Sequence, residues 1–309
     1  MIKISVIIAT RNRADALETI SLPSLVKQDF KDFEVIIWDA SNDDKSKIVV
    51  EKYIQSHPDM VIRYFKAPRV GSASQRNDAV KVAKGEIVFF IDDDSEVSPD
   101  GISTLIEVFE DKSVFGAGLP LKNSGNKQIL PFRKLLSRLY DLIFRLPHGS
   151  KKRKVMLSGW NIWPSNNDNP GKAEWLSGCS MGFRKTVFDK ISFNEELQKF
   201  GGYALGEDVE FSHRLFRNKI KIVISQKGYI IHREAKDGRL ENERIFAAQI
   251  YNHFIIWRTA IFPYNKLSIF VYLWSLFGEL LRNYINGVFK SNKKRIKGTS
   301  MGIKAIIKH

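Results

Sequence analysis

The sequence predicts an α/β fold, in which a mostly parallel sheet carries helices on both faces and is followed by a C-terminal helical extension. Two observations support this prediction. Ile4–Ala9 and Phe33–Trp38 are continuous apolar, β-branched runs, which are typical of strands buried on both faces of a parallel sheet. Segments with helical periodicity separate such runs at regular spacing, which indicates stacked βαβ units.

The expected elements follow one another in order along the chain. In the first hundred residues we expect strands at 4–9, 33–38, 61–65 and 86–91, with helices at 16–25, 47–55 and 71–83. Beyond them lie a basic, partly amphipathic stretch at 131–154, a loop at 165–171, a helix at 206–218, short strands at 220–225 and 229–231, and helices from 241. The pattern predicts a main domain at 1–240 and a basic, amphipathic helical tail at 241–309.

The formal net charge is +15, and most of the excess lies in two segments. Residues 122–154 contain ten Lys or Arg and one acid, Asp141, and residues 290–309 contain seven Lys or Arg and no acid. Such a surplus predicts a polyanionic partner, which could be nucleic acid, an anionic membrane surface or a phosphorylated substrate. The single cysteine, Cys179, excludes an intrachain disulfide and fits a reducing compartment.

Polar side chains follow each expected strand of the first half. They are Thr10 and Arg11, Asp39 and Ser41, Arg69 and Gly71, and Asp92 to Asp94. Ligands of such sheets bind beyond the carboxyl ends of the strands, which meet at one edge. The sequence therefore predicts a ligand site at this edge.

The acidic triplet Asp92-Asp93-Asp94 is a candidate metal site. Carboxylates at positions i and i+2 of a strand-end turn can share one Mg²⁺ or Mn²⁺, whose shell is completed by water and substrate phosphates. A solvated turn is the commoner explanation of three acids taken alone. The apolar strand that leads directly into the triplet favours the metal site, because it fixes the carboxylates at the ligand edge.

Gly71–Asn77 and Asp39 are candidate donors and acceptors for a phosphorylated ligand. Gly71 allows close backbone approach, the amides at a helix N-terminus favour an anion, and Arg76 adds a positive charge. A routine N-cap explains the glycine-serine pattern equally well. Asp39 can accept a hydrogen bond from a base or a ribose, although a strand-end aspartate is also a common helix cap.

Glu207 and Asp208 are the candidate general bases. They begin a helix after a glycine-rich stretch, so one of them could take a proton from an attacking hydroxyl. Acids at this position also stabilise the helix dipole, and that explanation is as good when the pair is considered alone. His232, at the end of a short strand, could be a metal ligand or a structural histidine.

Five motifs in this order resemble the family 2 glycosyltransferases of the GT-A fold. They are Thr10-Arg11-Asn12-Arg13, Asp39-Ala40-Ser41, GSASQRNDAVKVAKGEIVFFIDDDSEV from Gly71, WLSGCSMGFRKTVF from Trp175, and GEDVEFSHRLFRNKIKIVISQKGYIIHR from Gly206. The resemblance covers residues 2–235. It implies a Rossmann-like fold whose nucleotide-binding half is about 1–120 and whose acceptor half is about 120–240.

The resemblance also implies a reaction and a role for each matching residue. The enzyme would move a sugar from a UDP-, dTDP- or GDP-linked donor to an acceptor hydroxyl with inversion at the anomeric carbon, using Mn²⁺ or Mg²⁺. The implied donor-binding residues are Thr10, Arg11, Arg13, Asp39, Gly71, Arg76, Asp92 and Asp93. The implied acceptor and sugar cleft is lined by Trp175, Ser177 and Gly178. Asp94 and His232 would bind the metal, and Asp208, with Glu207 beside it, would be the catalytic acid of the ED motif.

Leu267–Leu281 is strongly apolar but offers only 12 residues before Glu279, short of the roughly 20 that span a bilayer. With Lys266 before it and many cations after it, the segment predicts an interfacial helix on anionic lipid. A core helix packed on the catalytic domain is an equal alternative. Similar tails occur in relatives that act on lipid-linked saccharides, so we expect a cytoplasmic protein at the inner face of the membrane with a saccharide or lipid-linked saccharide acceptor.

Three other functions compete with this one. A polyprenyl-phosphate glycosyl synthase is the nearest alternative within the family. A nucleotidyltransferase would also use a parallel sheet and paired carboxylates, but its first loop is usually rich in glycine, whereas this chain has Thr10–Arg13. A nucleic-acid-binding protein fits the net charge but leaves the acidic triplet unexplained, because acids beside a phosphate groove repel it. We therefore expect no nucleic-acid partner.

Overall fold

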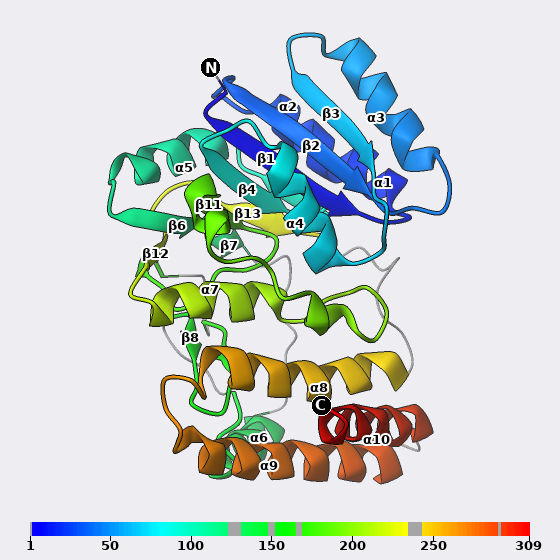
Figure 1. Ribbon diagram of the computed structural model, residues 1–309, viewed down its shortest axis with the longest axis vertical. Helices are drawn as coiled ribbons and strands as arrows, with labels where there is room; N and C mark the ends of the chain where they lie inside the picture. Colours follow the sequence, from blue (N-terminus) through cyan, green and yellow to red (C-terminus); the bar gives the residue numbers. More distant parts are fainter. Residues whose placement is uncertain (1, 123–130, 148–151, 165–168, 234–242, 290–291) are drawn as a thin grey trace.

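The computed structural model describes residues 2–122, 131–147, 152–164, 169–233, 243–289 and 292–309 (Figure 1). A twisted sheet and its covering helices form one end of the long axis, and three C-terminal helices form the other. The predicted α/β class, with a mostly parallel sheet, flanking helices and a helical C-terminal region, is confirmed.

The central sheet has eight strands in the order β10-β12-β6-β11-β4-β1-β2-β3. They are β1 (Ile4–Thr10), β2 (Phe33–Asp39), β3 (Val61–Lys66), β4 (Ile87–Ile91), β6 (Val114–Gly118), β10 (Gly171–Lys172), β11 (Met181–Arg184) and β12 (Lys221–Ile224). The first four strands pair in parallel, as predicted, and so do β6 and β12. β11 joins these two groups because it runs antiparallel to both β4 and β6.

Two small sheets complete the strand inventory of the described residues. β13 (Ile230–His232) lies between β5 (Ser95–Val97) and β7 (Leu121–Lys122), and β8 (Lys154–Val155) pairs with β9 (Asn161–Ile162). In the loop predicted at 165–171, residues 165–168 lie outside the described residues, and Gly171 already belongs to β10.

The helices predicted at 16–25, 47–55, 71–83 and 206–218 are present, whereas the helix at 101–110 and the 3₁₀ turns at 185–189 and 195–198 were not predicted. The helical elements are α1 (Ala14–Ala16), the π-helical turn η1 (Leu17–Ser21), α2 (Leu22–Val26), α3 (Lys45–Ser56), α4 (Ser72–Val82), α5 (Gly101–Glu110), α6 (Pro131–Ile143), the 3₁₀ turns η2 (Lys185–Asp189) and η3 (Glu195–Gln198), α7 (Glu207–Arg217), α8 (Glu243–Ala260), α9 (Ser268–Phe289) and α10 (Lys293–Ile307). The helix predicted at 16–25 widens into a π turn just before Pro23. Pro23 lacks the N–H group that a regular α-helix would donate to the carbonyl of Thr19.

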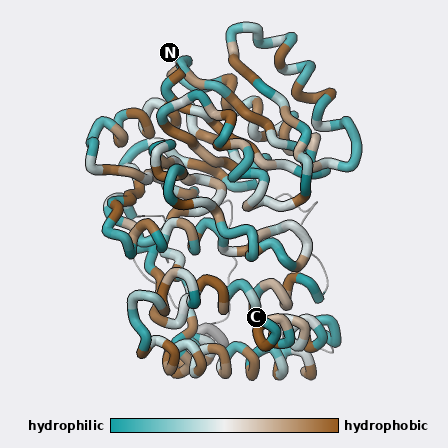
Figure 2. The backbone as a smooth tube through the Cα atoms, in the orientation of Figure 1, coloured by the Kyte–Doolittle hydropathy of each residue, from teal (hydrophilic) through white to brown (hydrophobic). Residues whose placement is uncertain are grey.

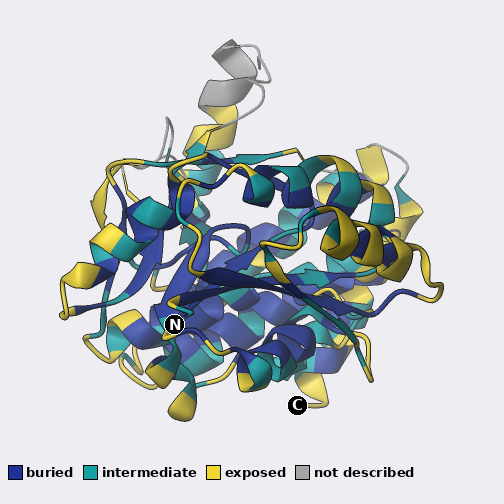
Figure 3. Cartoon of the chain, turned by 90° about the horizontal axis from the view of Figure 1, so that it is seen from above, coloured by how far each residue is buried: buried dark blue, intermediate teal, exposed yellow. Residues whose placement is uncertain are grey.

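The sheet has one apolar core on each face. Successive side chains of a strand point to opposite faces, so the uniformly apolar strands supply both cores. Ile7 and Phe90 pack with residues of α4 and α7, whereas Ile8 and Phe89 pack with residues of α2, α3 and α5. Viewed along the long axis, the buried strands lie inside and the exposed surfaces belong to the outer helices (Figure 3).

The C-terminal helices continue the packing of the sheet domain. α8 lies against α7, and α10 lies against both α8 and α9 (Figure 1). Tyr251 and Ile255 of α8 and Ala305 of α10 belong to the same core as the β1 and β4 side chains. Gly302 permits this close approach, because a Cβ atom there would lie 2.8 Å from the carbonyl oxygen of Ala247. The domain boundary at residue 241 stays a prediction, and residues 234–242 are outside the described ranges.

α9 runs past its predicted end at Leu281 as far as Phe289. Glu279 does not end the helix because it is turned into the protein, where burial raises the pKa of its carboxyl while Arg282 opposes that shift. Arg282 also forms an ion pair with Asp141 of α6. Within the described ranges, no helix combines the length and the apolar character needed to cross a bilayer.

Glu34 forms a buried ionic network that ties β1, β2 and β3 together. Its carboxylate accepts hydrogen bonds from Ser5 Oγ at 2.7 Å and from Arg63 Nη1 at 2.9 Å, and the N–H of Lys84 also donates to it. Burial alone would raise the pKa of Glu34, but these donors outweigh it and hold the pKa below its ordinary value. The charged form of Glu34 therefore stabilises the fold.

We expect the Glu34→Gln substitution to lower the free energy of unfolding by about 1–3 kcal/mol at pH 7, because it removes a charge-assisted buried acceptor. A lowered folded-state pKa contributes stability above the unfolded value of about 4.3, and this stability is lost as the pH falls through the folded value. The difference between wild type and variant should therefore shrink below about pH 4 in thermal melts followed by circular dichroism. The exposed Glu107→Gln variant is the matched control, and a difference that persists unchanged in acid would contradict the assignment.

Candidate active site

The predicted site residues meet at the carboxyl edge of the sheet. β1 ends at Thr10 and β2 at Asp39, which are register partners, and the acidic triplet follows the last residue of β4. α4 begins at the same edge, where the Gln75 side chain donates to the carbonyl oxygens of Thr10 at 3.0 Å and Trp38 at 2.8 Å. These bonds fix the start of α4 on the ends of β1 and β2.

Asp92, Asp94 and His232 form a group that fits a divalent cation. One ligand atom from each lies within 4.8 Å of the other two, and His232 Nε2 is 2.9 Å from Asp94 Oδ1 and 3.8 Å from Asp92 Oδ2. β13 brings the histidine here because it pairs with β5, where His232 lies opposite Ser95. Two carboxylate oxygens and one imidazole nitrogen are suitable ligands for Mn²⁺, and the carboxylates suit Mg²⁺.

Asp93 faces away from this group. It accepts hydrogen bonds from Thr10 Oγ1 at 2.7 Å and Arg13 Nη1 at 2.8 Å, and Arg13 also reaches Asp94 Oδ2 at 3.2 Å. Burial raises the pKa of Asp93 to about 6, although Arg13 and Thr10 oppose that shift. The structure thus brings three of the predicted donor-binding residues together as a support for the acidic turn.

Arg76 lies between the acidic turn and the start of α7. Its Nη2 donates to Asp92 Oδ1 at 3.0 Å, and its Nη1 forms an ion pair with Glu207. The second oxygen of Glu207 accepts a hydrogen bond from Ser72 Oγ at 2.9 Å. Both oxygens of Glu207 are therefore engaged, and its side chain is only 5% exposed. Glu207 therefore holds Arg76 in place. The sequence also allowed Glu207 to be the catalytic base, and this geometry does not fit that role.

Asp208 is the more accessible acid of the pair. Its Oδ2 accepts from the N–H of Gly178 at 2.8 Å, and its Oδ1 accepts from its neighbour Val209 at 2.9 Å. Burial raises the pKa of Asp208, although the two N–H donors and the charge of Arg76 oppose the shift. Asp208 as a residue remains partly exposed, whereas Glu207 is buried.

Gly206 positions the first turn of α7, which carries Glu207 and Asp208. It adopts the left-handed conformation, with φ at +83°, and a Cβ atom there would lie 2.8 Å from Ile256 of α8. Glycine is the residue that adopts this conformation without strain. The first turn of α7 therefore sits directly on α8, and its acids complement the positive end of the helix dipole.

The remaining donor-binding candidates near this edge, Asp39, Arg11 and Gly71, differ in their burial and in their hydrogen bonds. Asp39 is fully buried and accepts from the N–H of Ser41 and from Tyr64 Oη, each at 2.8 Å. Arg11 is partly buried, and its Nε has no hydrogen-bond partner among the described residues. Gly71 leaves room for the side chain of Gln198, which accepts from the N–H of Ser74 at 3.3 Å. At the helix start where an anion was expected, the Gln198 side chain therefore accepts from the amide of Ser74, and the amide of Ser72 donates to the carbonyl oxygen of Gly202.

The three residues expected to line the acceptor cleft do not share one environment. Gly178 lies at the centre, with its N–H on Asp208 and its carbonyl oxygen 3.5 Å from Arg76 Nη2. Ser177 is buried beside Cys179. Trp175 differs from the expectation, because its ring is fully buried and packs edge-on against Trp163 and near the guanidinium of Arg153. Trp175 is therefore a buried packing residue rather than part of an exposed lining.

Sequence reasoning missed Ser72, Gln75 and Tyr64. All three hold a predicted residue or strand end in place through the hydrogen bonds described above. Ser72 and Gln75 lie within the motif that begins at Gly71, so their position next to Arg76 was the available signal. Tyr64 had no comparable signal, because an aromatic residue in a strand usually serves the core.

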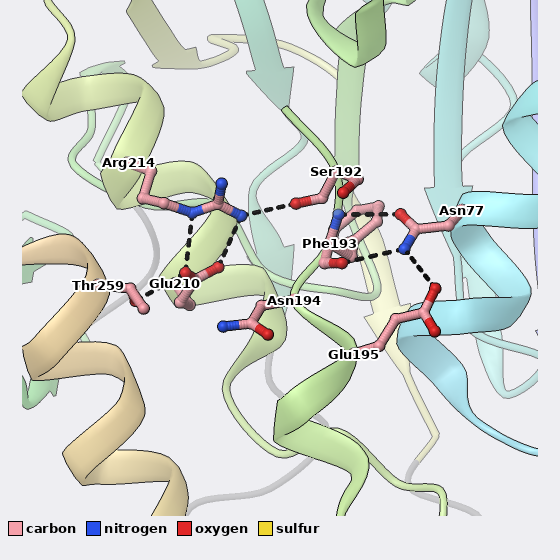
Figure 4. A pocket seen from close by; sticks show the side chains of 8 residues that line it. All are labelled: Asn77, Ser192, Phe193, Asn194, Glu195, Glu210, Arg214 and Thr259. Atoms are coloured by element: carbon pink, nitrogen blue, oxygen red, sulfur yellow. Dashed lines mark hydrogen bonds and ion pairs between the residues drawn. The ribbon is translucent and has the colours of Figure 1, made fainter. Parts of the chain in front are cut away.

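Two hollows lie on the surface of the described residues. One is lined by residues of the first loop and α1, with Asp43 and Lys45 beside them, and its lining includes Arg13, which bonds to Asp93 and Asp94 of the acidic turn. The other lies between α4, α7 and α8 and is shown in Figure 4. Its polar groups bind one another: Arg214 pairs with Glu210 at 2.8 Å, and Asn77 bonds to the backbone of Phe193. The polar groups around this second hollow therefore hold neighbouring elements together.

Comparison with known proteins identifies the family of this chain. The family model described as "Glycosyl transferase family 2" matches residues 5–166. A curated relative, the GalNAc(5)-diNAcBac-PP-undecaprenol beta-1,3-glucosyltransferase of Campylobacter jejuni, is 38% identical over 109 residues. That match spans 35% of this chain and 34% of that enzyme.

Two solved structures of GT-A transferases have the same fold. Staphylococcus aureus TarS 1–349 in complex with UDP-GlcNAc aligns with a TM-score of 0.57 and 20% identity, over 92% of this chain and 74% of that one. The mannosyltransferase PcManGT of Pyrobaculum calidifontis, in complex with GDP-Man and Mn²⁺, aligns with a TM-score of 0.56 and 16% identity, over 99% and 86%. Because the family model matches more than half of the residues, this chain belongs to glycosyl transferase family 2.

Proposed function

We propose that this chain is an inverting, metal-dependent glycosyltransferase, which moves a sugar from a nucleoside diphosphate to an acceptor hydroxyl. One observation carries the proposal. Arg76 connects the candidate metal group to the candidate base, since it bonds to Asp92 on one side and lies beside the carbonyl of Gly178, whose N–H holds Asp208. The edge of the sheet thus brings together a candidate cation group, a guanidinium and the carboxylate of a partly exposed aspartate.

These groups can carry out a single displacement. In the proposed reaction, Asp208 takes the proton of the acceptor hydroxyl while the hydroxyl oxygen bonds to the anomeric carbon from the face opposite the diphosphate. The bond between that carbon and the diphosphate oxygen breaks, and the nucleoside diphosphate departs with the electron pair. A divalent cation held by Asp92, Asp94 and His232 would supply charge compensation for the diphosphate, and Arg76 adds a fixed positive charge beside it.

The identity of the donor and acceptor is part of the proposal. TarS was solved with UDP-GlcNAc and PcManGT with GDP-Man and Mn²⁺. The name of the Campylobacter relative describes a saccharide linked to undecaprenol by a pyrophosphate. We therefore propose a nucleotide-sugar donor, a saccharide or lipid-linked saccharide acceptor and a location at the inner face of the membrane.

The family match favours this function over a nucleotidyltransferase or a nucleic-acid-binding protein. The first test is a thermal-shift screen of UDP, GDP, dTDP and CDP, each with and without Mn²⁺ or Mg²⁺. A ligand that binds only the folded state adds about 2.7 kcal/mol at a hundredfold excess over its dissociation constant. We expect one nucleotide to raise the melting temperature only when metal is present, and no shift with any nucleotide would refute the donor site.

The Asp94→Asn substitution tests the metal group independently of catalysis. We expect Mn²⁺ affinity, measured by titration calorimetry, to fall at least about tenfold because one charged ligand is lost. Glu96→Gln is the matched control, since Glu96 lies two residues further on and pairs with Arg233 outside the group. Equal Mn²⁺ affinity in both variants and wild type would move the metal elsewhere.

The two acids of α7 should separate in kinetics. For Asp208→Asn we expect kcat to fall by about 10²–10⁴ with nucleotide binding retained, as when a positioned base is removed. The wild-type rate should rise with pH above the ordinary aspartate value of about 3.9, because burial raises the pKa of Asp208 and only the ionised form accepts a proton. Glu207→Gln should weaken donor binding, because Glu207 holds Arg76 in place. The rise of the rate with pH should remain in this variant. Nearly full activity of Asp208→Asn would favour a phosphate acceptor instead, as in a polyprenyl-phosphate glycosyl synthase.

A further inference from the structure

α6 and α9 lie at the end of the molecule remote from the sheet (Figure 1), and Figure 2 shows hydrophobic residues along this end of the chain. Both helices carry exposed apolar side chains. The principal ones are 47–70% exposed and recur at helical spacing, which gives one stripe on each helix. They are Leu136, Leu139 and Leu142 of α6, and Phe270, Trp274 and Phe277 of α9. We call this set the apolar platform. Exposed apolar stripes on two helices that pack on each other indicate an interaction surface.

The two helices are fastened to each other. Trp274 Nε1 donates to the carbonyl oxygen of Ile143 at 2.7 Å, and Tyr140 Oη donates to that of Gly278 at 2.7 Å. Phe144 stacks on Trp274 with ring centroids 5.2 Å apart, and it occupies the space that a side chain at position 278 would need. The platform is therefore one fixed surface of two helices.

Its charge identifies the partner. Each helix contains one acid, and both acids are turned inward: Asp141 pairs with Arg282, and Glu279 is buried beside them. Within the described part of the two helices, the outward surface thus carries no carboxylate. Arg138, Arg145 and Lys266, which adjoin the apolar side chains in the sequence, are all exposed.

From these observations we infer that the apolar platform docks in the surface of an anionic lipid bilayer. An apolar face bordered by cations suits lipid tails beneath acidic headgroups, and an indole ring suits the boundary between them. A second copy of this chain would bring like charges together, which disfavours a dimer through this surface. The inference deepens the proposed membrane location, goes beyond the single helix predicted at 267–281, and requires no sugar transfer.

Co-sedimentation of the full chain with vesicles tests this surface. We expect binding to vesicles of phosphatidylcholine with phosphatidylglycerol, weaker binding at high salt and little binding to phosphatidylcholine alone. The double substitution Leu139→Ser with Leu142→Ser should weaken binding at least about tenfold, and so should Phe270→Ser with Phe277→Ser. Ile48→Ser with Ile54→Ser on α3 is the matched control, because both side chains are exposed at the opposite end of the molecule, and it should bind like wild type.

Three results would overturn the inference. They are no binding to anionic vesicles, unchanged binding of the α6 double variant, or a wild-type dimer in sedimentation velocity that becomes a monomer in the platform variants. Melting temperatures of the variants should stay near wild type, since the substituted side chains are exposed. The metal-dependent nucleotide shift is measured on the same proteins. If the nucleotide shift is present but the protein does not bind vesicles, the lipid surface is refuted and the donor site stands. If the protein binds vesicles but shows no nucleotide shift, the donor site is refuted and the lipid surface stands.

Discussion

Negative charge crowded at one edge of the sheet is the constraint on which the site depends. Five carboxylates meet there, from Asp92, Asp93, Asp94, Glu207 and Asp208. Buried carboxylates are costly unless a cation accompanies them, and here two arginines, Arg13 and Arg76, are 15% and 7% exposed among them. Arg76 can reach both sides only if α4 begins at this edge and α7 begins opposite it. The pairing of these charges therefore requires that both helices begin at this edge.

The sequence was most informative where physical rules are local. β-branched runs predicted the parallel strands, and the edge they share predicted where the polar residues gather. The alternation of side chains within a turn after a strand explains why Asp92 and Asp94 act together while Asp93 turns toward Thr10. Because successive side chains of a strand also alternate between the two faces of the sheet, each apolar strand contributes to both cores.

The features that sequence could not predict depend on contacts between distant segments. Only the family resemblance joined His232 to the acidic turn, since spacing along the chain does not reveal that β13 pairs with β5. The burial of Trp175 depends on Arg153 and Trp163, which lie in a stretch without regular periodicity. Gln198 fills the start of α4 from a 3₁₀ turn more than a hundred residues away. Each of these is a long-range packing event.

The place of His232 in the chain has a consequence for synthesis. A growing chain emerges N-terminus first, so Asp92 and Asp94 leave the ribosome about 140 residues before the histidine does. β1 to β4 and their helices can pack around their core in that interval, while the histidine of the candidate metal group does not yet exist. The complete group of Asp92, Asp94 and His232 therefore requires that the chain has been made as far as β13 and that β13 has docked. A product that stops early or misplaces this strand lacks the histidine and keeps only the two carboxylates of the group.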